Sequence, residues 1–173
     1  MRGITTAILG LAGALACVPL LAKSETAKIT ITSPALHSTV EITDPQVRAF
    51  SVWSGPGVRV DGVEQMEGFI INWRQGVVKE LPSGLRHVEV AFYGDASDQP
   101  VYTVFYDYNP VSGEGYVYLP GKNDEGYTRN TAAVLHGTEW EGHWFRATAA
   151  WETFVRPLIA RARSVSLNSR VMF

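Results

Sequence analysis

The most suggestive pattern in the sequence is a set of tyrosines at alternating positions. Tyr106 and Tyr108 end one apolar segment, and Tyr116 and Tyr118 lie in the next one, after a polar, turn-forming connection. Side chains two residues apart on a strand point to the same face. If the two segments pair as a hairpin, the sequence predicts that one face carries all four phenol rings.

Two polar side chains, Asn123 and Asp124, follow the second of these segments. Aromatic rings offer flat faces to a sugar ring, and amide and carboxylate groups can bond to its hydroxyls. The four tyrosines with Asn123 and Asp124 are therefore a candidate binding surface for a glycan or a peptide. The alternative, and the commoner case for strand tyrosines, is that they only stabilise the hairpin, since aromatic cross-strand pairs contribute about 0.2–1 kcal/mol each.

A second candidate cluster consists of Glu139, Glu141 and His143. In an extended segment these three residues alternate onto one face, where two carboxylates and an imidazole are suitable ligands for a divalent metal. The neighbouring Gly137 and Gly142 favour the alternative, an exposed hairpin end where charged side chains are simply solvated.

Standard catalytic and cofactor-binding motifs are absent from the sequence. We find no Gly-x-Ser-x-Gly, no His-Glu-x-x-His, no phosphate-binding loop and no dinucleotide-binding glycine pattern, so no cofactor is expected. His37 and His87 are isolated, and an isolated histidine is usually a surface or satisfied, partly buried residue. The formal net charge of −2 gives no basic footprint for nucleic acid.

A two-residue period dominates the chain from residue 28 onward. Ile29 and Ile31 alternate with polar residues, as do Val40 and Ile42, which predicts strands with one buried face. Further predicted strands are Val47–Trp53, Gly68–Trp73, His87–Tyr93, Val101–Tyr108 and Gly115–Leu119. Asp61-Gly62 predicts a tight hairpin, because a type I′ turn needs positive φ at both central residues. Short turns between strands indicate an antiparallel meander.

The period changes to a helical one near the C-terminus. Apolar residues recur three or four positions apart from Trp151 to Ala162, which predicts an amphipathic helix over about Ala149–Arg163. Thr148 is its expected N-cap. Pro157 is expected to kink or split the helix. The charged residues of this segment are expected on the outward side: Glu152, Arg156, Arg161 and Arg163.

The first 22 residues predict export. Arg2 precedes an almost uncharged apolar run, Ile4–Ala22, which has the shape of a secretory signal peptide. Cleavage after Ala22 or after Ala16 fits the small residues there, and the second cut would leave Cys17 first. Secretion or a periplasmic location is expected, with no membrane span after processing. A lipid anchor at Cys17 and a retained membrane helix are the alternatives.

Four segments resemble a group of bacterial secreted proteins that share a domain of unknown function. They are SVWSGPG at Ser51–Gly57, EGFIINW at Glu67–Trp73, YVYLPGKNDE at Tyr116–Glu125 and HWFRATAAWETFVRPLIARA at His143–Ala162. The resemblance implies an exported domain over about residues 39–163, and it implies no activity, cofactor or catalytic residue. Where the group has a further aromatic after YLPGK-x-DE, this chain has Gly126-Tyr127.

The sequence thus predicts an α+β protein, an antiparallel meandering sheet packed by a C-terminal amphipathic helix. The expected order is a signal peptide at 1–22, a lead-in and first strand at 23–38, one domain at 39–163 and a tail at 164–173. The expected role is a binding or structural accessory protein of the cell envelope or exterior. The competing class is a small extracytoplasmic hydrolase or lyase whose carboxylates and histidines meet only in the fold.

Overall fold

The structure is a computed structural model, and it describes residues 25–50, 55–56, 59–64, 66, 70–95, 98–129 and 138–169. The apolar segment Ile4–Ala22 lies outside the described residues. The elements in the described ranges are β1 (Thr26–Thr32), β2 (Val40–Ile42), η1 (Pro45–Ala49), β3 (Arg59–Val60), β4 (Val63–Glu64), η2 (Trp73–Gln75), β5 (Val77–Val78), β6 (Arg86–Gly94), β7 (Tyr102–Tyr108), β8 (Gly115–Leu119), η3 (Tyr127–Arg129), β9 (His143–Arg146) and α1 (Ala149–Ser169).

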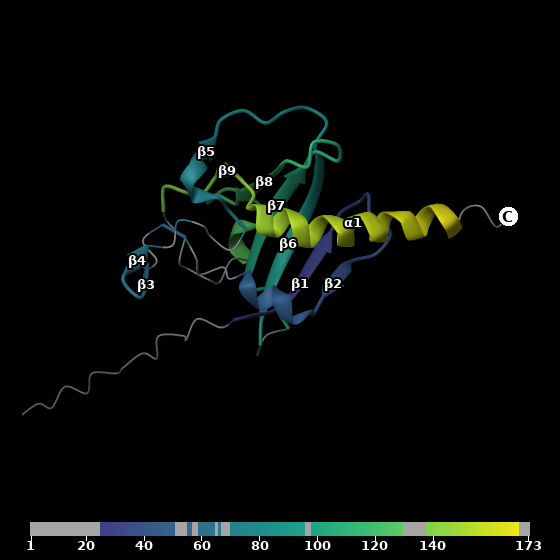
Figure 1. The fold of residues 1–173 in the computed structure, drawn as a ribbon, viewed down its shortest axis with the longest axis horizontal. Coiled ribbons are helices and arrows are strands. Elements are labelled where there is room, and N and C mark those ends of the chain that lie inside the picture. The colour runs from purple at the N-terminus through teal and green to yellow at the C-terminus, as the bar shows by residue number, and fades with distance from the viewer. Residues whose placement is uncertain are drawn as a thin grey trace, which may run out of the picture.

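Seven of these strands pair into one antiparallel sheet (Figure 1). Their spatial order is β2-β1-β6-β7-β8-β9-β5, so strands β6 to β9 form the predicted meander. The N-terminal strand β1 inserts between β2 and β6. A separate hairpin consists of β3 and β4, and its turn has φ values of 51° at Asp61 and 79° at Gly62, which confirms the predicted hairpin.

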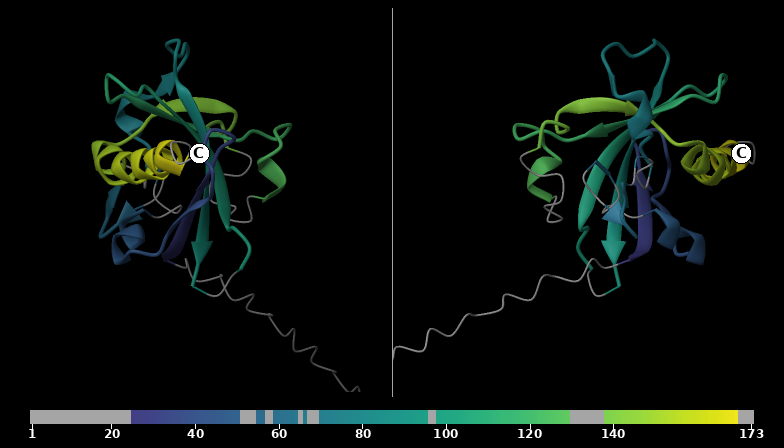
Figure 2. Two further views of the ribbon diagram at one scale, coloured as in Figure 1. Left: turned by 90° about the vertical axis from the view of Figure 1, so that its right-hand side faces the viewer. Right: turned by 60° about the vertical axis from the view of Figure 1, so that its left-hand side comes forward.

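Helix α1 lies across one face of the sheet, which we call the inner face; the opposite one is the outer face (Figure 2). Trp151, Val155 and Ile159 are buried. The centroid of the Trp151 indole lies 6.4 Å from that of Phe92 and 5.8 Å from that of Tyr106. The predicted α+β fold, with a C-terminal helix on an antiparallel sheet, is therefore confirmed, and the core lies between α1 and the inner face.

The start of α1 is where the sequence predicts it, but the helix ends later than predicted. Thr148 caps the helix as predicted, since its Oγ1 accepts the Trp151 backbone N–H at 3.2 Å. The helix is not split at Pro157 and runs on to Ser169, beyond the predicted end. Pro157 is exposed, and buried residues on both sides of it hold the two halves against the sheet. Among the described residues, no helix is both long and apolar enough to cross a bilayer.

Two predicted strands have a different structure. In Val47–Trp53, residues 47–49 belong to η1 and Phe50 is its C-cap, because the Asp44 carboxylate accepts the Gln46 backbone N–H at 2.8 Å and starts a helical turn. The described part of Gly68–Trp73 contributes one isolated bridge, at Ile71, before η2 begins. In the first of these segments, the turn that Asp44 starts overrides the apolar pattern.

The buried stripe of α1 makes a prediction about stability. Trp151→Ala should lower the free energy of unfolding by about 3–5 kcal/mol, because it removes a fully buried indole from the core. Thr153→Ala, at an exposed position of the same helix, should change it by less than about 0.5 kcal/mol. Urea denaturation followed by circular dichroism measures both. Equal effects would show that α1 does not pack through Trp151.

Candidate functional site

The outer face of the sheet carries a row of rings that crosses four adjacent strands. We call these residues the outer ring row: His87 on β6, Phe105 on β7, Tyr118 on β8 and Trp144 on β9. Phe105 lies directly opposite Tyr118, and Tyr118 lies directly opposite Trp144. Successive ring centroids are 5.3, 6.1 and 5.0 Å apart. The rings therefore form a continuous strip on a rigid sheet.

The outer ring row is accessible from solvent. The His87 side chain is 55% exposed, and Phe105, Tyr118 and Trp144 are half-buried. Tyr116, on the same face, is only 2% exposed, and the Arg146 guanidinium lies 5.3 Å from its ring centroid. Rings held in place by neighbours on both sides lose little freedom when a ligand stacks on them.

A polar pair adjoins one end of the row. The Nδ1 atom of His87 lies 2.6 Å from Oδ1 of Asp107, directly across the β6–β7 ladder. Burial raises the pKa of the Asp107 carboxyl, and the hydrogen bond with His87 opposes part of that rise. A carboxylate that accepts Nδ1–H orients the imidazole and leaves Nε2 as a proton acceptor. The pair can therefore bond to a ligand hydroxyl or accept its proton.

The loop after β8 is attached to the row through Asp124. Its Oδ2 accepts the Tyr118 phenol at 2.7 Å and the Gly121 backbone N–H at 2.6 Å. Burial, and then the hydrogen bond to Asp124, raise the pKa of Tyr118 to about 12. Of the two predicted polar ligand contacts, Asp124 is thus engaged within the protein, whereas Asn123 is exposed.

The predicted single face of four tyrosines is wrong. Tyr108 pairs with Gly115 and Tyr106 with Val117, so Tyr106 and Tyr108 share a face with Val117 and not with the tyrosines of β8. Tyr106 is 0% and Tyr108 4% exposed, beneath α1. Tyr116 and Tyr118 lie on the outer face. Because the connection between β7 and β8 has six residues, even-numbered residues of β7 pair with odd-numbered residues of β8. The tyrosines of β7 and those of β8 therefore lie on opposite faces of the sheet.

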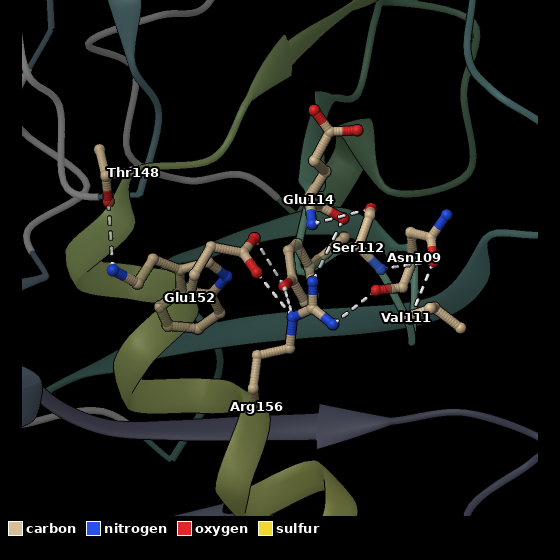
Figure 3. Close-up of polar contacts among 9 residues, drawn as sticks. Asn109, Val111, Ser112, Glu114, Thr148, Glu152 and Arg156 are labelled. Atoms are coloured by element: carbon tan, nitrogen blue, oxygen red, sulfur yellow. Dashed lines mark hydrogen bonds and ion pairs between the residues drawn. The ribbon is translucent and has the colours of Figure 1, made fainter.

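On the inner face, Glu152 and Arg156 of α1 lie beside the connection between β7 and β8 (Figure 3). Tyr106 of β7 joins them in a polar cluster. Its hydroxyl donates to Glu152 Oε1 at 2.8 Å and accepts from Arg156 Nε at 3.1 Å. Arg156 Nε also donates to Glu152 Oε2 at 2.6 Å. Burial, and then the Glu152 carboxylate, raise the pKa of the Tyr106 phenol. The expectation that Glu152 and Arg156 face outward is therefore wrong, because the phenol provides a buried polar partner for both.

Arg156 extends from this cluster to the connection between the strands. Its Nη1 donates to the carbonyl of Asn109 at 2.7 Å and its Nη2 to that of Glu114 at 3.2 Å. Its guanidinium also lies 4.6 Å from the ring centroid of Tyr108. The donors of Arg156 are directed to groups of the protein itself, so we interpret this cluster as structural.

The predicted metal site is not formed. Glu139 and Glu141 lie in a turn that ends at Gly142, whose φ is 77°, and His143 begins β9 beyond it. The turn breaks the alternation that would put the three side chains on one face. Within the described residues, which include all three, no group of His, Cys, Asp or Glu side chains could hold a metal ion.

Of the outer ring row, the sequence patterns predict only Tyr118 as a binding residue. His87 was interpreted as isolated, although its partner Asp107 stands opposite it once β6 and β7 pair. Phe105 alternates with the tyrosines of β7, so strand alternation alone places it on the face opposite Tyr106. The outer ring row can therefore be predicted only when the register of the β6–β7 and β7–β8 hairpins is known in addition to the alternation along each strand.

Comparison of the chain with protein-family profiles, with curated proteins and with solved structures found no match.

The Arg156 cluster predicts a stability effect that depends on the shape of the guanidinium. Arg156→Ala should lower the free energy of unfolding by about 1–3 kcal/mol, because charge-assisted hydrogen bonds and their buried partners are lost. Arg156→Lys should recover less than half of this, since one ammonium cannot replace the planar fork. The exposed Arg161→Ala is the matched control in urea denaturation, expected within about 0.5 kcal/mol of the parent. An Arg156→Lys variant as stable as the parent would contradict this account.

The Tyr118–Asp124 contact predicts a shifted titration. With a pKa of about 12 in the folded protein, against about 10 in an unfolded chain, Tyr118 contributes stability below about pH 10 that is lost as the pH rises through its folded pKa. Asp124→Asn should lower the pKa of Tyr118. Carbon-13 NMR of tyrosine Cζ measures it, with Tyr118→Phe assigning the signal. An unchanged pKa in Asp124→Asn would contradict the hydrogen bond.

Proposed function

We propose that this protein is an exported binding domain that holds a glycan on the outer ring row. The observation that carries the proposal is the continuous strip of four rings across β6 to β9, which is partly exposed on the face opposite α1. Aromatic faces spaced about 5–6 Å apart can stack on the apolar faces of a sugar chain. Export is supported by the apolar segment Ile4–Ala22.

Polar groups beside the rings supply partners for sugar hydroxyls. The His87–Asp107 pair lies at one end of the row, and the exposed Asn123 lies in the loop that Tyr118 and Asp124 hold together. A few directional groups around an apolar strip are the usual composition of a specific small-ligand site. The glycan is therefore expected to lie across the strands, along the line from His87 to Trp144.

A second candidate function is favoured by the same polar pair. A histidine oriented by a half-buried carboxylate is a suitable general base, so a hydrolase or lyase that acts on the bound glycan is the alternative. The two functions differ in what happens to the ligand. A binding domain returns the oligosaccharide intact, whereas an enzyme shortens it.

The proposal predicts loss of binding when the rings are removed. Screening the purified protein on an array of soluble oligosaccharides, including cellohexaose and chitohexaose, should identify a ligand. In calorimetric titration with that ligand, Trp144→Ala and Phe105→Ala should each weaken binding at least about tenfold, which corresponds to about 1.4 kcal/mol. Tyr93→Ala, a half-buried aromatic on the same face but outside the row, should bind like the parent.

Four outcomes decide between the possibilities. An array without any ligand, or equal binding by Trp144→Ala and Tyr93→Ala, would contradict the proposed function. Mass spectrometry of the recovered oligosaccharide distinguishes the alternative. Shortened products that disappear in His87→Gln would establish the enzyme, and an intact ligand would support the binding domain.

A further inference from the structure

An apolar groove lies on the other side of the molecule, between η1 and α1. Its volume is about 690 Å³. Ala49 and Phe50 form one wall, and Ala150, Phe154 and Leu158 form the other. Phe50 and Phe154 contact each other at the base, with ring centroids 5.0 Å apart. Because α1 lies on the inner face (Figure 2), this groove is separate from the outer ring row.

The groove follows the axis of α1. Ala150, Phe154 and Leu158 are four residues apart, and Arg161 follows three residues later, so all four lie along one stripe of the helix. From Ala150 to Arg161 this stripe extends about 16 Å, at about 1.5 Å per residue. It is thus a long, narrow apolar surface and fits a linear chain better than a compact ring.

One charged side chain lines the groove. Arg161 stands at its C-terminal end, and the described lining contains no carboxylate. Among the described residues, the Arg161 guanidinium has no ion pair or hydrogen bond; the Ser164 hydroxyl donates to its backbone carbonyl at 2.9 Å. By contrast, Arg156 and Arg163 on the same helix both donate to groups of the protein. Arg161 is therefore available to an anion at the end of an apolar groove.

We propose that this groove binds a free fatty acid, with its acyl chain along Ala150, Phe154 and Leu158 and its carboxylate at Arg161. Apolar burial drives the chain into the groove, and the cation selects an acid over a neutral amphipath. A 16 Å stripe accommodates about 12 carbons, since C–C bonds of about 1.5 Å advance an extended chain by about 1.3 Å each. A second copy of this chain is a poorer occupant, because its groove would bring another Arg161 and no lining carboxylate.

The test uses the full-length protein and the fluorescent fatty acid cis-parinarate. The probe should bind saturably with enhanced fluorescence, laurate should displace it, and dodecanol should displace it at least about tenfold less well. Arg161→Ala should weaken binding of the probe about tenfold. Leu158→Gln should weaken it further, with circular dichroism confirming that the variant is folded. Lys79→Ala, an exposed cation outside the groove, is the matched control and should bind like the parent.

Each opposite outcome would overturn the assignment. The first is that cis-parinarate does not bind saturably, and the second is that laurate and dodecanol displace it equally well. The third is that the affinity for cis-parinarate is unchanged in Arg161→Ala or in folded Leu158→Gln. If sedimentation shows a dimer that Leu158→Gln dissociates, the groove is an interface between copies instead. Binding to phosphatidylglycerol vesicles without binding of free laurate would assign the surface to a membrane. None of these results depends on the glycan proposal, because the oligosaccharide titrations use a different face.

Discussion

Gly115 stands at the start of β8, opposite Tyr108, at a position where the protein has no room for a side chain. A Cβ atom there would come within 2.6 Å of Cε2 of Tyr106 and would also meet the Glu152 carboxylate. The glycine therefore lets the helix cluster of Tyr106, Glu152 and Arg156 close directly over the hairpin. This close approach lets α1 pack directly on the inner face of the β7–β8 hairpin, whose register assigns side chains to the two faces of the sheet.

That pairing gives the two faces different chemistry. On the inner face, Tyr106 and Tyr108 of β7 are buried, and Glu152 and Arg156 of α1 are paired with each other and with Tyr106. On the outer face, the same register brings Phe105, Tyr118 and Trp144 into one line, with the His87–Asp107 pair at its end. A partly exposed strip of rings on a paired sheet is suited to binding, which is why we favour this face over the helix cluster as the functional surface. The buried polar contacts thus lie on one side of the sheet, and the partly exposed outer ring row lies on the other.

The sequence predicts those elements whose signal is local and periodic. Three such elements form as expected. They are the strand around Ile29 and Ile31, the strand Gly115–Leu119 and the amphipathic helix that Thr148 caps. The sequence-based prediction is wrong where a short turn interrupts the pattern. Asp44 starts a helical turn in place of a predicted strand, and the turn at Gly142 ends the alternation of the predicted metal site. Polar turn residues satisfy backbone groups within a few positions, so they override a preference that is spread over a whole segment.

Taken alone, the sequence determined the fold class, the position of the helix, and the alternation that sends Phe105 and Tyr106 to opposite faces of one strand. Such features depend on neighbours within a few residues. Only the tertiary structure decided which residues of different strands meet, because register depends on the length of each connection and on the packing above it. A shift of one residue would send Tyr118 to the other face. The outer ring row and the His87–Asp107 pair are therefore properties of the folded sheet, assembled from β6, β7, β8 and β9.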